Sequence, residues 1–160
     1  MLMNNTAYFN QNEFIKNVEK ALKNGFENDN KVPPHYWFNL FGKRKLKIYD
    51  SAVVDKPSFP CCHILATGVP STANSHSTQV NQYSRVLLEI QIQNVATESG
   101  NKEFIGNLIV NKVIQILQTD FGLIMSNNVN IQNYDEKINR AFLRWSFIYD
   151  NINKIIYKGV

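Results

Sequence analysis

Apolar and polar residues alternate along residues 84–96, and the alternation predicts a strand with one buried face. The apolar side carries Val86, Leu88, Ile90 and Ile92, and the other carries Arg85, Glu89, Gln91 and Gln93. A period of two is that of a half-buried strand. After a turn at 97–100, the apolar spacing changes to that of a helix.

A long helix is predicted over residues 101–121. Its broad apolar stripe holds Phe104, Ile105, Leu108, Ile109, Val113, Ile116 and Leu117. Asn101 suits the N-cap, Glu103 suits the positive end of the helix dipole, and Gly122 suits a left-handed position after the last turn. At about 1.5 Å per residue the helix would be roughly 30 Å long, enough to span a small domain.

Two further elements complete a core. Residues 141–149 alternate as a final strand, with one face made of Ala141, Leu143, Trp145, Phe147 and Tyr149. A helix beginning at Asn12 has an apolar face of Phe14, Ile15, Val18, Ala21 and Leu22, followed by Gly25. We therefore expect a single α+β domain over residues 1–160, a mainly antiparallel or mixed sheet packed by the N-terminal helix and the long central helix.

The remaining segments are more weakly patterned. Residues 1–10 are expected to form an extended arm, 61–67 a strand buried on both faces, and 68–82 a polar projecting loop. A short strand or bulge is expected near 129–132, and a short return strand over 152–157. Residues 35–41 are aromatic and 43–49 alternate, which predicts either one long strand bent at Gly42 or a hairpin; the sequence leaves both open.

The positive charge is concentrated in one place. The chain of 160 residues has a net charge of +4, and four of its 17 basic residues lie within 43–47. Such a run attracts phosphate, although a solvated strand face is the commoner explanation. The neighbouring aromatics Tyr36, Trp37 and Phe38 cannot share one strand face, so core packing or a subunit interface is favoured over a single-strand nucleic-acid groove.

No pattern of catalytic or ligand-binding residues stands out. The sequence has no phosphate-binding glycine loop, nucleophile elbow or zinc-protease motif. The adjacent Cys61 and Cys62 are expected to be reduced core residues, because neighbours in a strand point to opposite faces. His63 beside them lacks the second ligand pair of a zinc site. We expect neither enzyme activity nor a cofactor nor a metal.

The N-terminus lacks a charged segment followed by an apolar run, and no stretch approaches the roughly 20 apolar residues of a membrane helix. A soluble protein of the cytoplasm is therefore expected, with no membrane partner.

The arrangement of these elements resembles that of phage tail terminators, also called tail-completion proteins. The similarity covers roughly residues 14–149: an amphipathic first helix, strands, a polar arm, a strand entering a long apolar helix, and the closing strand Asn139-Arg140-Ala141-Phe142-Leu143-Arg144-Trp145-Ser146-Phe147. The resemblance is one of architecture, and the family has no fixed residue motif to carry over.

The resemblance implies a homo-oligomeric ring, typically a hexamer, assembled in the cytoplasm of a bacterial host. Such a ring caps the tail tube, ends its polymerisation and docks head-completion proteins. In headless contractile particles it forms the collar, and the implied partners are the tube protein and sheath protein. DNA passing through the lumen would meet only nonspecific phosphate attraction.

A closed ring needs two different patches on each subunit. The residues that a monomer explains least are polar and exposed, and we predict that they contribute to ring or tube contacts: Lys43, Arg44, Lys45, Lys47, Ser71, Asn74, His76, Gln79, Arg140 and Arg144. Arg140 and Arg144 are four positions apart in the predicted strand, so both side chains point to the same face of the sheet. There they either form an intersubunit contact or are solvated.

Two alternatives belong to other classes. A head–tail connector or neck protein of the same particle would share the architecture. A small basic nucleic-acid-binding module would account for the pI near 9.0 and the aromatic-basic stretch. A tube subunit is disfavoured, because it needs long hairpins where this chain has a dominant helix.

Overall fold

The computed structural model describes residues 8–51, 54–70, 82–124, 129–132 and 136–159. Three helices and six strands occur in these ranges. In chain order they are α1 (Gln11–Glu27), α2 (Tyr36–Leu40), β1 (Lys47–Tyr49), β2 (Cys61–Pro70), β3 (Tyr83–Val95), α3 (Lys102–Phe121), β4 (Val129–Gln132), β5 (Ile138–Asp150) and β6 (Ile155–Gly159).

The strands form one mixed sheet in the order β1-β2-β3-β5-β4, with β6 also paired to β5. Its centre is the antiparallel pair β3–β5, which runs in register over all 13 residues of each strand. β1 pairs parallel to β2, and every other pairing is antiparallel. Because β3 occupies one side of β5, β4 and β6 share its other side at opposite ends. The fold is α+β, as predicted.

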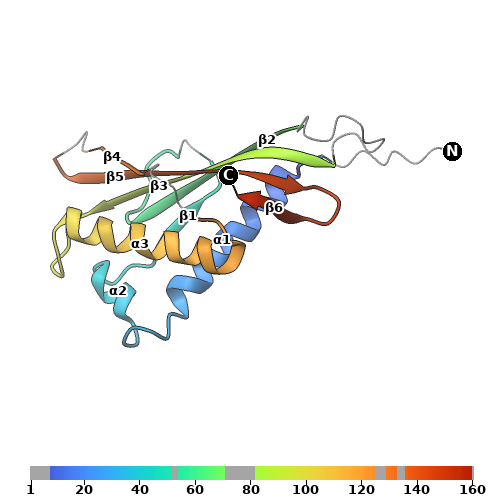
Figure 1. The fold of residues 1–160 in the computed structure, drawn as a ribbon. Coiled ribbons are helices and arrows are strands. Elements are labelled where there is room, and N and C mark those ends of the chain that lie inside the picture. Colours follow the sequence, from blue (N-terminus) through green and yellow to red (C-terminus); the bar gives the residue numbers. More distant parts are fainter. Residues whose placement is uncertain (1–7, 52–53, 71–81, 125–128, 133–135, 160) are drawn as a thin grey trace.

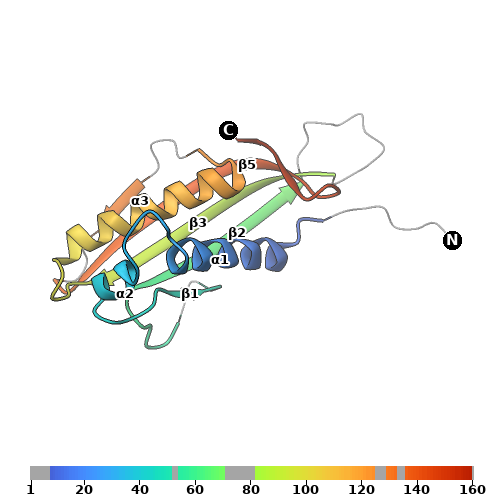
Figure 2. The ribbon, with the colours of Figure 1, turned by 90° about the horizontal axis from the view of Figure 1, so that it is seen from below.

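The long helices lie on one face of the sheet (Figure 1). Seen from that side, α1 runs beside α3 in front of the strands (Figure 2). The buried residues of α1 are Phe14, Ile15, Val18, Leu22 and Phe26, and those of α3 include Ile109, Val113 and Leu117. They join the inward residues of β2, β3 and β5 in one apolar cluster.

The central strand–helix–strand unit follows its sequence pattern closely. The Asn101 side chain accepts a hydrogen bond from the Phe104 N–H at 2.7 Å, and Gly122 adopts the left-handed conformation with φ 68°. Burial alternates along β3 and β5 as predicted. One detail differs: Phe104, assigned to the apolar stripe, is 49% exposed, whereas Val110 is buried.

The prediction of a bent strand or hairpin over 35–49 is wrong. Residues 36–40 form α2, and only Lys47–Tyr49 is a strand. The helical signal was the spacing of Trp37, Leu40 and Phe41, which are all buried and lie on one side of a helical turn. The consecutive aromatic residues 36–38 and the alternation of residues 43–49 concealed it.

The turn after β3 fixes the end of α2. The Thr97 hydroxyl donates to the Leu40 carbonyl at 2.8 Å, and the Ser99 hydroxyl donates to the Asn39 carbonyl at 3.1 Å. The last carbonyls of a helix lack i+4 partners within it, and side-chain donors help to satisfy them; the Asn39 carbonyl also accepts from the Gly42 N–H at 3.1 Å. The hairpin-like turn thereby positions the basic segment that follows α2.

Three other segment boundaries differ from the expected ones. The loop predicted at 68–82 begins later, because Gly68–Pro70 still belong to β2. The first helix does not end at Gly25 but continues to Glu27, where Phe26 is buried. The arm predicted at 1–10 does not include Phe9, because this residue packs on the core. Its ring centroid lies 5.5 Å from the ring centroids of both Phe14 and Tyr149. Residues 1–7 of the predicted arm lie outside the described residues.

Candidate assembly surfaces

The sheet face opposite α1 and α3 has no helix of the described residues over it in Figure 1. Strand register and alternation place these β3 and β5 residues on it: Arg85, Leu87, Glu89, Gln91, Gln93, Arg140, Phe142, Arg144, Ser146 and Ile148. We call this surface the open face. Leu87 is 46% exposed there, and Val69 of β2 is 58% exposed. Arginine and aromatic residues beside apolar ones are typical of interface cores.

Arg140 and Arg144 lie on the same side, as predicted from their parity. Arg144 is opposite Glu89 in the register, and its Nε lies 3.4 Å from the Glu89 Oε2. The Arg144 side chain is half exposed, so water screens the pair and limits its contribution to less than about 1 kcal/mol. This ion pair therefore explains little of the monomer's stability.

The basic segment approaches one end of the open face. Lys43, Arg44 and Lys45 are exposed in the connection between α2 and β1, and Lys47 begins β1. The register aligns Lys47 with Cys61, Gln93 and Arg140 across four strands. At about 4.8 Å per strand spacing, Lys47 and Arg140 are about 14 Å apart. The structure thus brings these two predicted residues to one row but not into contact.

Four of the predicted interface residues cannot be placed. Ser71, Asn74, His76 and Gln79 lie in the connection between β2 and β3, outside the described residues. Their assignment to ring or tube contacts remains a prediction.

The cysteines are free and buried, which confirms their expected role as core residues. Burial raises the pKa of the Cys61 thiol to about 12 and raises that of Cys62 further. Because thiolate is the reactive form, both are inert at neutral pH. His63 is buried beside them; its Nδ1 lies 2.9 Å from the Ser51 carbonyl and its ring stacks on Tyr49.

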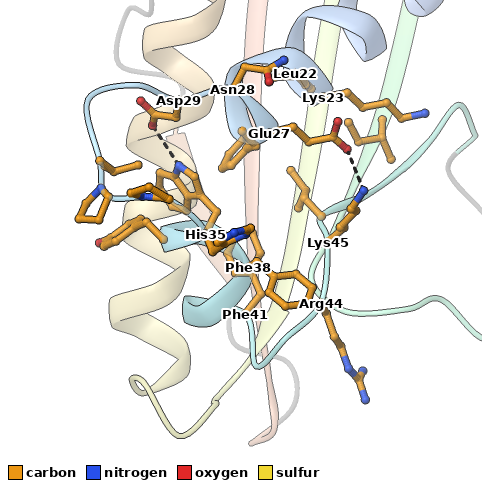
Figure 3. Close-up of a pocket in the computed structure, with 18 residues that line it drawn as sticks. Leu22, Lys23, Glu27, Asn28, Asp29, His35, Phe38, Phe41, Arg44 and Lys45 are labelled. Carbon is orange, nitrogen blue, oxygen red and sulfur yellow. Dashed lines mark hydrogen bonds and ion pairs between the residues drawn. The ribbon is translucent and has the colours of Figure 1, made fainter.

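A cavity of about 550 Å³ opens between the end of α1, α2 and residues 44–48 (Figure 3). Its aromatic wall includes Phe26 and Trp37, whose ring centroids are 4.8 Å apart. The Lys45 Nζ lies 3.8 Å from the Glu27 Oε1 beside it, while Arg44 extends away from the cavity. Because Trp37 and Phe41 are core residues, they are unavailable for stacking on nucleic-acid bases.

Sequence reasoning missed the buried ion pair behind this cavity. The Asp29 Oδ2 lies 2.9 Å from the Lys112 Nζ and accepts from the Trp37 Nε1 at 3.0 Å. Burial alone would raise the pKa of the Asp29 carboxyl, but hydrogen bonds from Trp37, Lys112 and Lys31 outweigh it and lower that pKa. Asp29 lies in the polar segment Asn28-Asp29-Asn30, and nothing in the sequence pairs it with Lys112, 83 positions later.

Over the described residues, no three His, Cys, Asp or Glu side chains gather in a way that would hold a metal ion. Within the same part of the chain, no helix is long and apolar enough to cross a membrane. No protein-family model matches the sequence, and no curated protein matches it either.

Proposed function

We propose that this protein is a structural subunit of a ring that caps the tail tube of a phage or phage-tail-like particle. The ring, a hexamer in this proposal, ends tube polymerisation and docks head-completion or collar components. The observation that carries the proposal is the one-sided build of the sheet: the helices lie on one face, and the open face and the strand edges are uncovered by described residues (Figure 1).

In this proposal α1 and α3 are the layer that packs the sheet and holds it rigid. Ring contacts are heterologous, so each subunit must present two different surfaces. The two sides of the sheet differ as required: one has β1 and the basic segment, and the other has β4 and β6. Its tube-facing partners would be the tube protein and, in contractile particles, the sheath protein.

The mass in solution tests the proposal directly. The chain has a mass of 18.5 kDa, so a hexamer would have a mass of about 111 kDa. We expect sedimentation to give an oligomer of this order, and negative-stain images to show closed rings. Particles produced without the protein are expected to carry overlong tails, since nothing stops tube growth. A chain that stays monomeric, together with tails of normal length, would contradict the proposal.

The 71–78 segment gives a second test. Removing residues 71–78 shortens this connection and leaves both neighbouring strands, which belong to the core sheet, intact. If this segment contributes to ring or tube contacts, its deletion is expected to impair ring assembly or tail-length control while leaving the circular dichroism spectrum unchanged. A folded deletion variant with normal rings and tails would show that the loop assignment is wrong.

A further inference from the structure

Two strand edges at the same end of the sheet lack partners among the described residues. β1 pairs with β2 only at Cys61–His63, so β2 from Ile64 to Pro70 is paired on one side alone, by β3. On the opposite side, β6 pairs only with β5. The register runs from Gly68 through Val86 and Phe147 to Gly159. At this end the sheet is therefore β2-β3-β5-β6, and no described residue pairs with either outer edge.

The β2 edge lacks the devices that normally prevent strand association. Its free part reads Ile-Leu-Ala-Thr-Gly-Val-Pro and contains no charged side chain. At about 3.3 Å per residue, these seven residues offer roughly 23 Å of unpaired backbone donors and acceptors. Protected edges usually carry charges, proline or a bulge. Here proline occurs only at the last position, Pro70, and Val69 is 58% exposed.

The β6 edge offers exposed apolar side chains, as the β2 edge does, although it also carries Lys158 and its pairing with β5 has a bulge between Ile148 and Tyr149. The large side chains of Ile155 and Tyr157 are 55% and 63% exposed on this strand. Following the antiparallel steps from β2 to β3, β5 and β6, β6 runs opposite to β2. When identical copies stand side by side in the same orientation, β6 of one and β2 of the next therefore meet antiparallel.

We propose that residues 64–70 of β2 pair with β6 of a neighbouring copy, which joins the sheets of adjacent subunits into one continuous sheet. The occupant of each edge is a second copy, because the two edges run in opposite directions and the unpaired backbone groups of one can bind those of the other. Such a contact is heterologous and can close into a ring. Backbone hydrogen bonds would supply affinity, and the exposed Val69 and Tyr157 would become covered. The inference rests on the proposed ring function and adds its subunit contact.

Engineered cysteines test the pairing. Val69 lies on the open face, and the Tyr157 ring packs 5.0 Å from that of Tyr83, a residue with open-face parity. We expect mild oxidation of Val69→Cys/Tyr157→Cys, or of Thr67→Cys/Tyr157→Cys if the register is shifted, to give a ladder of covalent multimers. The matched single-cysteine variants should give no ladder, since the native Cys61 and Cys62 are buried and inert. Absence of a ladder in both double variants would overturn the pairing.

A charged side chain introduced on the β2 edge tests whether this edge takes part in ring assembly. Val69→Lys is expected to shift the sedimentation mass from the ring toward the monomer, whereas the control Phe38→Lys on α2, also at an exposed apolar residue, should leave the mass unchanged.

In the wild type, amide hydrogen exchange at 64–70 should slow at least about tenfold on assembly. Rings that form with unchanged exchange at 64–70 would overturn the inference and leave the proposed function standing. A wild-type chain that is monomeric at every concentration would remove both.

Discussion

Replacing Lys112 by methionine is expected to lower the free energy of unfolding by about 3–5 kcal/mol. Lys112 and Asp29 are only 12% and 5% exposed, and their charged atoms are 2.9 Å apart. Methionine keeps the apolar stem of the lysine but leaves the Asp29 carboxylate buried without its cation. The expected loss of stability comes from leaving a buried carboxylate without its cation. This loss is larger than the net stabilisation that the intact ion pair gives the folded protein. Denaturant unfolding followed by circular dichroism measures it.

The matched control is Lys23→Met. Lys23 forms an i,i+4 pair with Glu19 on α1 at a similar distance of 2.9 Å, but both side chains are substantially exposed. Removing it should cost less than about 1 kcal/mol, because solvent screens such pairs. The double variant Asp29→Asn/Lys112→Met removes both charges and should recover part of the loss. Equal effects of Lys112→Met and Lys23→Met would mean that the Asp29 pair is no stronger than a surface pair.

Acid titration gives the same pair a second readout. Because the folded pKa of Asp29 is lowered from 3.8, its contribution is fully present above that value and is lost as the pH falls through the folded pKa. The stability difference between wild type and Asp29→Asn should therefore be largest at neutral pH and shrink in acid. The pKa of Asp150 is also lowered, by hydrogen bonds from Asn153, Ile152 and Gln82 that outweigh burial. Some acid sensitivity should thus remain in the variant.

The sequence predicted those elements whose periodicity agrees with their packing. β3, α3 and β5 each carry one apolar face of constant period, and the Asn101 and Gly122 caps mark the ends of α3. The pattern failed at α2, where five residues are too few for a period to show and consecutive aromatics mimic a strand. Pro33 and Pro34 precede α2, and helices often begin after such residues, so the two prolines do not exclude a helix there.

The candidate surfaces were predicted less well, and for a physical reason. Alternation showed that Arg140 and Arg144 share a side, but only the register reveals that Lys47 lies in the Arg140 row. Unpaired strand edges leave no mark on the side-chain pattern, since they are a property of backbone pairing. The unpaired edge from Ile64 to Pro70 exists because β1 ends after three residues, and the side-chain pattern does not predict that length.

Gly106→Ala is expected to destabilise the protein by about 2–4 kcal/mol, the opposite of what helix propensity alone predicts. Gly106 lies inside α3, where alanine would ordinarily stabilise by roughly 1 kcal/mol. Here α3 approaches the sheet over two buried amides: Asn139 donates to the Asn94 Oδ1 at 3.3 Å, and Asn94 donates to the Lys102 carbonyl at 2.8 Å. A Cβ at position 106 would collide with the Asn139 amide and lie 2.9 Å from the Asn94 Oδ1.

Thermal unfolding checks this, with an expected fall in Tm of roughly 5–12 °C for Gly106→Ala. Asn107→Ala is the control, because this neighbour on the same helix is exposed and alanine there should be neutral or slightly stabilising. Removing the obstructing amide in Gly106→Ala/Asn139→Ala should make the combined loss smaller than the sum of the single losses. A Gly106→Ala variant as stable as Asn107→Ala would show that α3 can shift away from the sheet at no cost. In that case α3 would pack less tightly on the sheet than the close approach of Gly106 to Asn94 and Asn139 indicates.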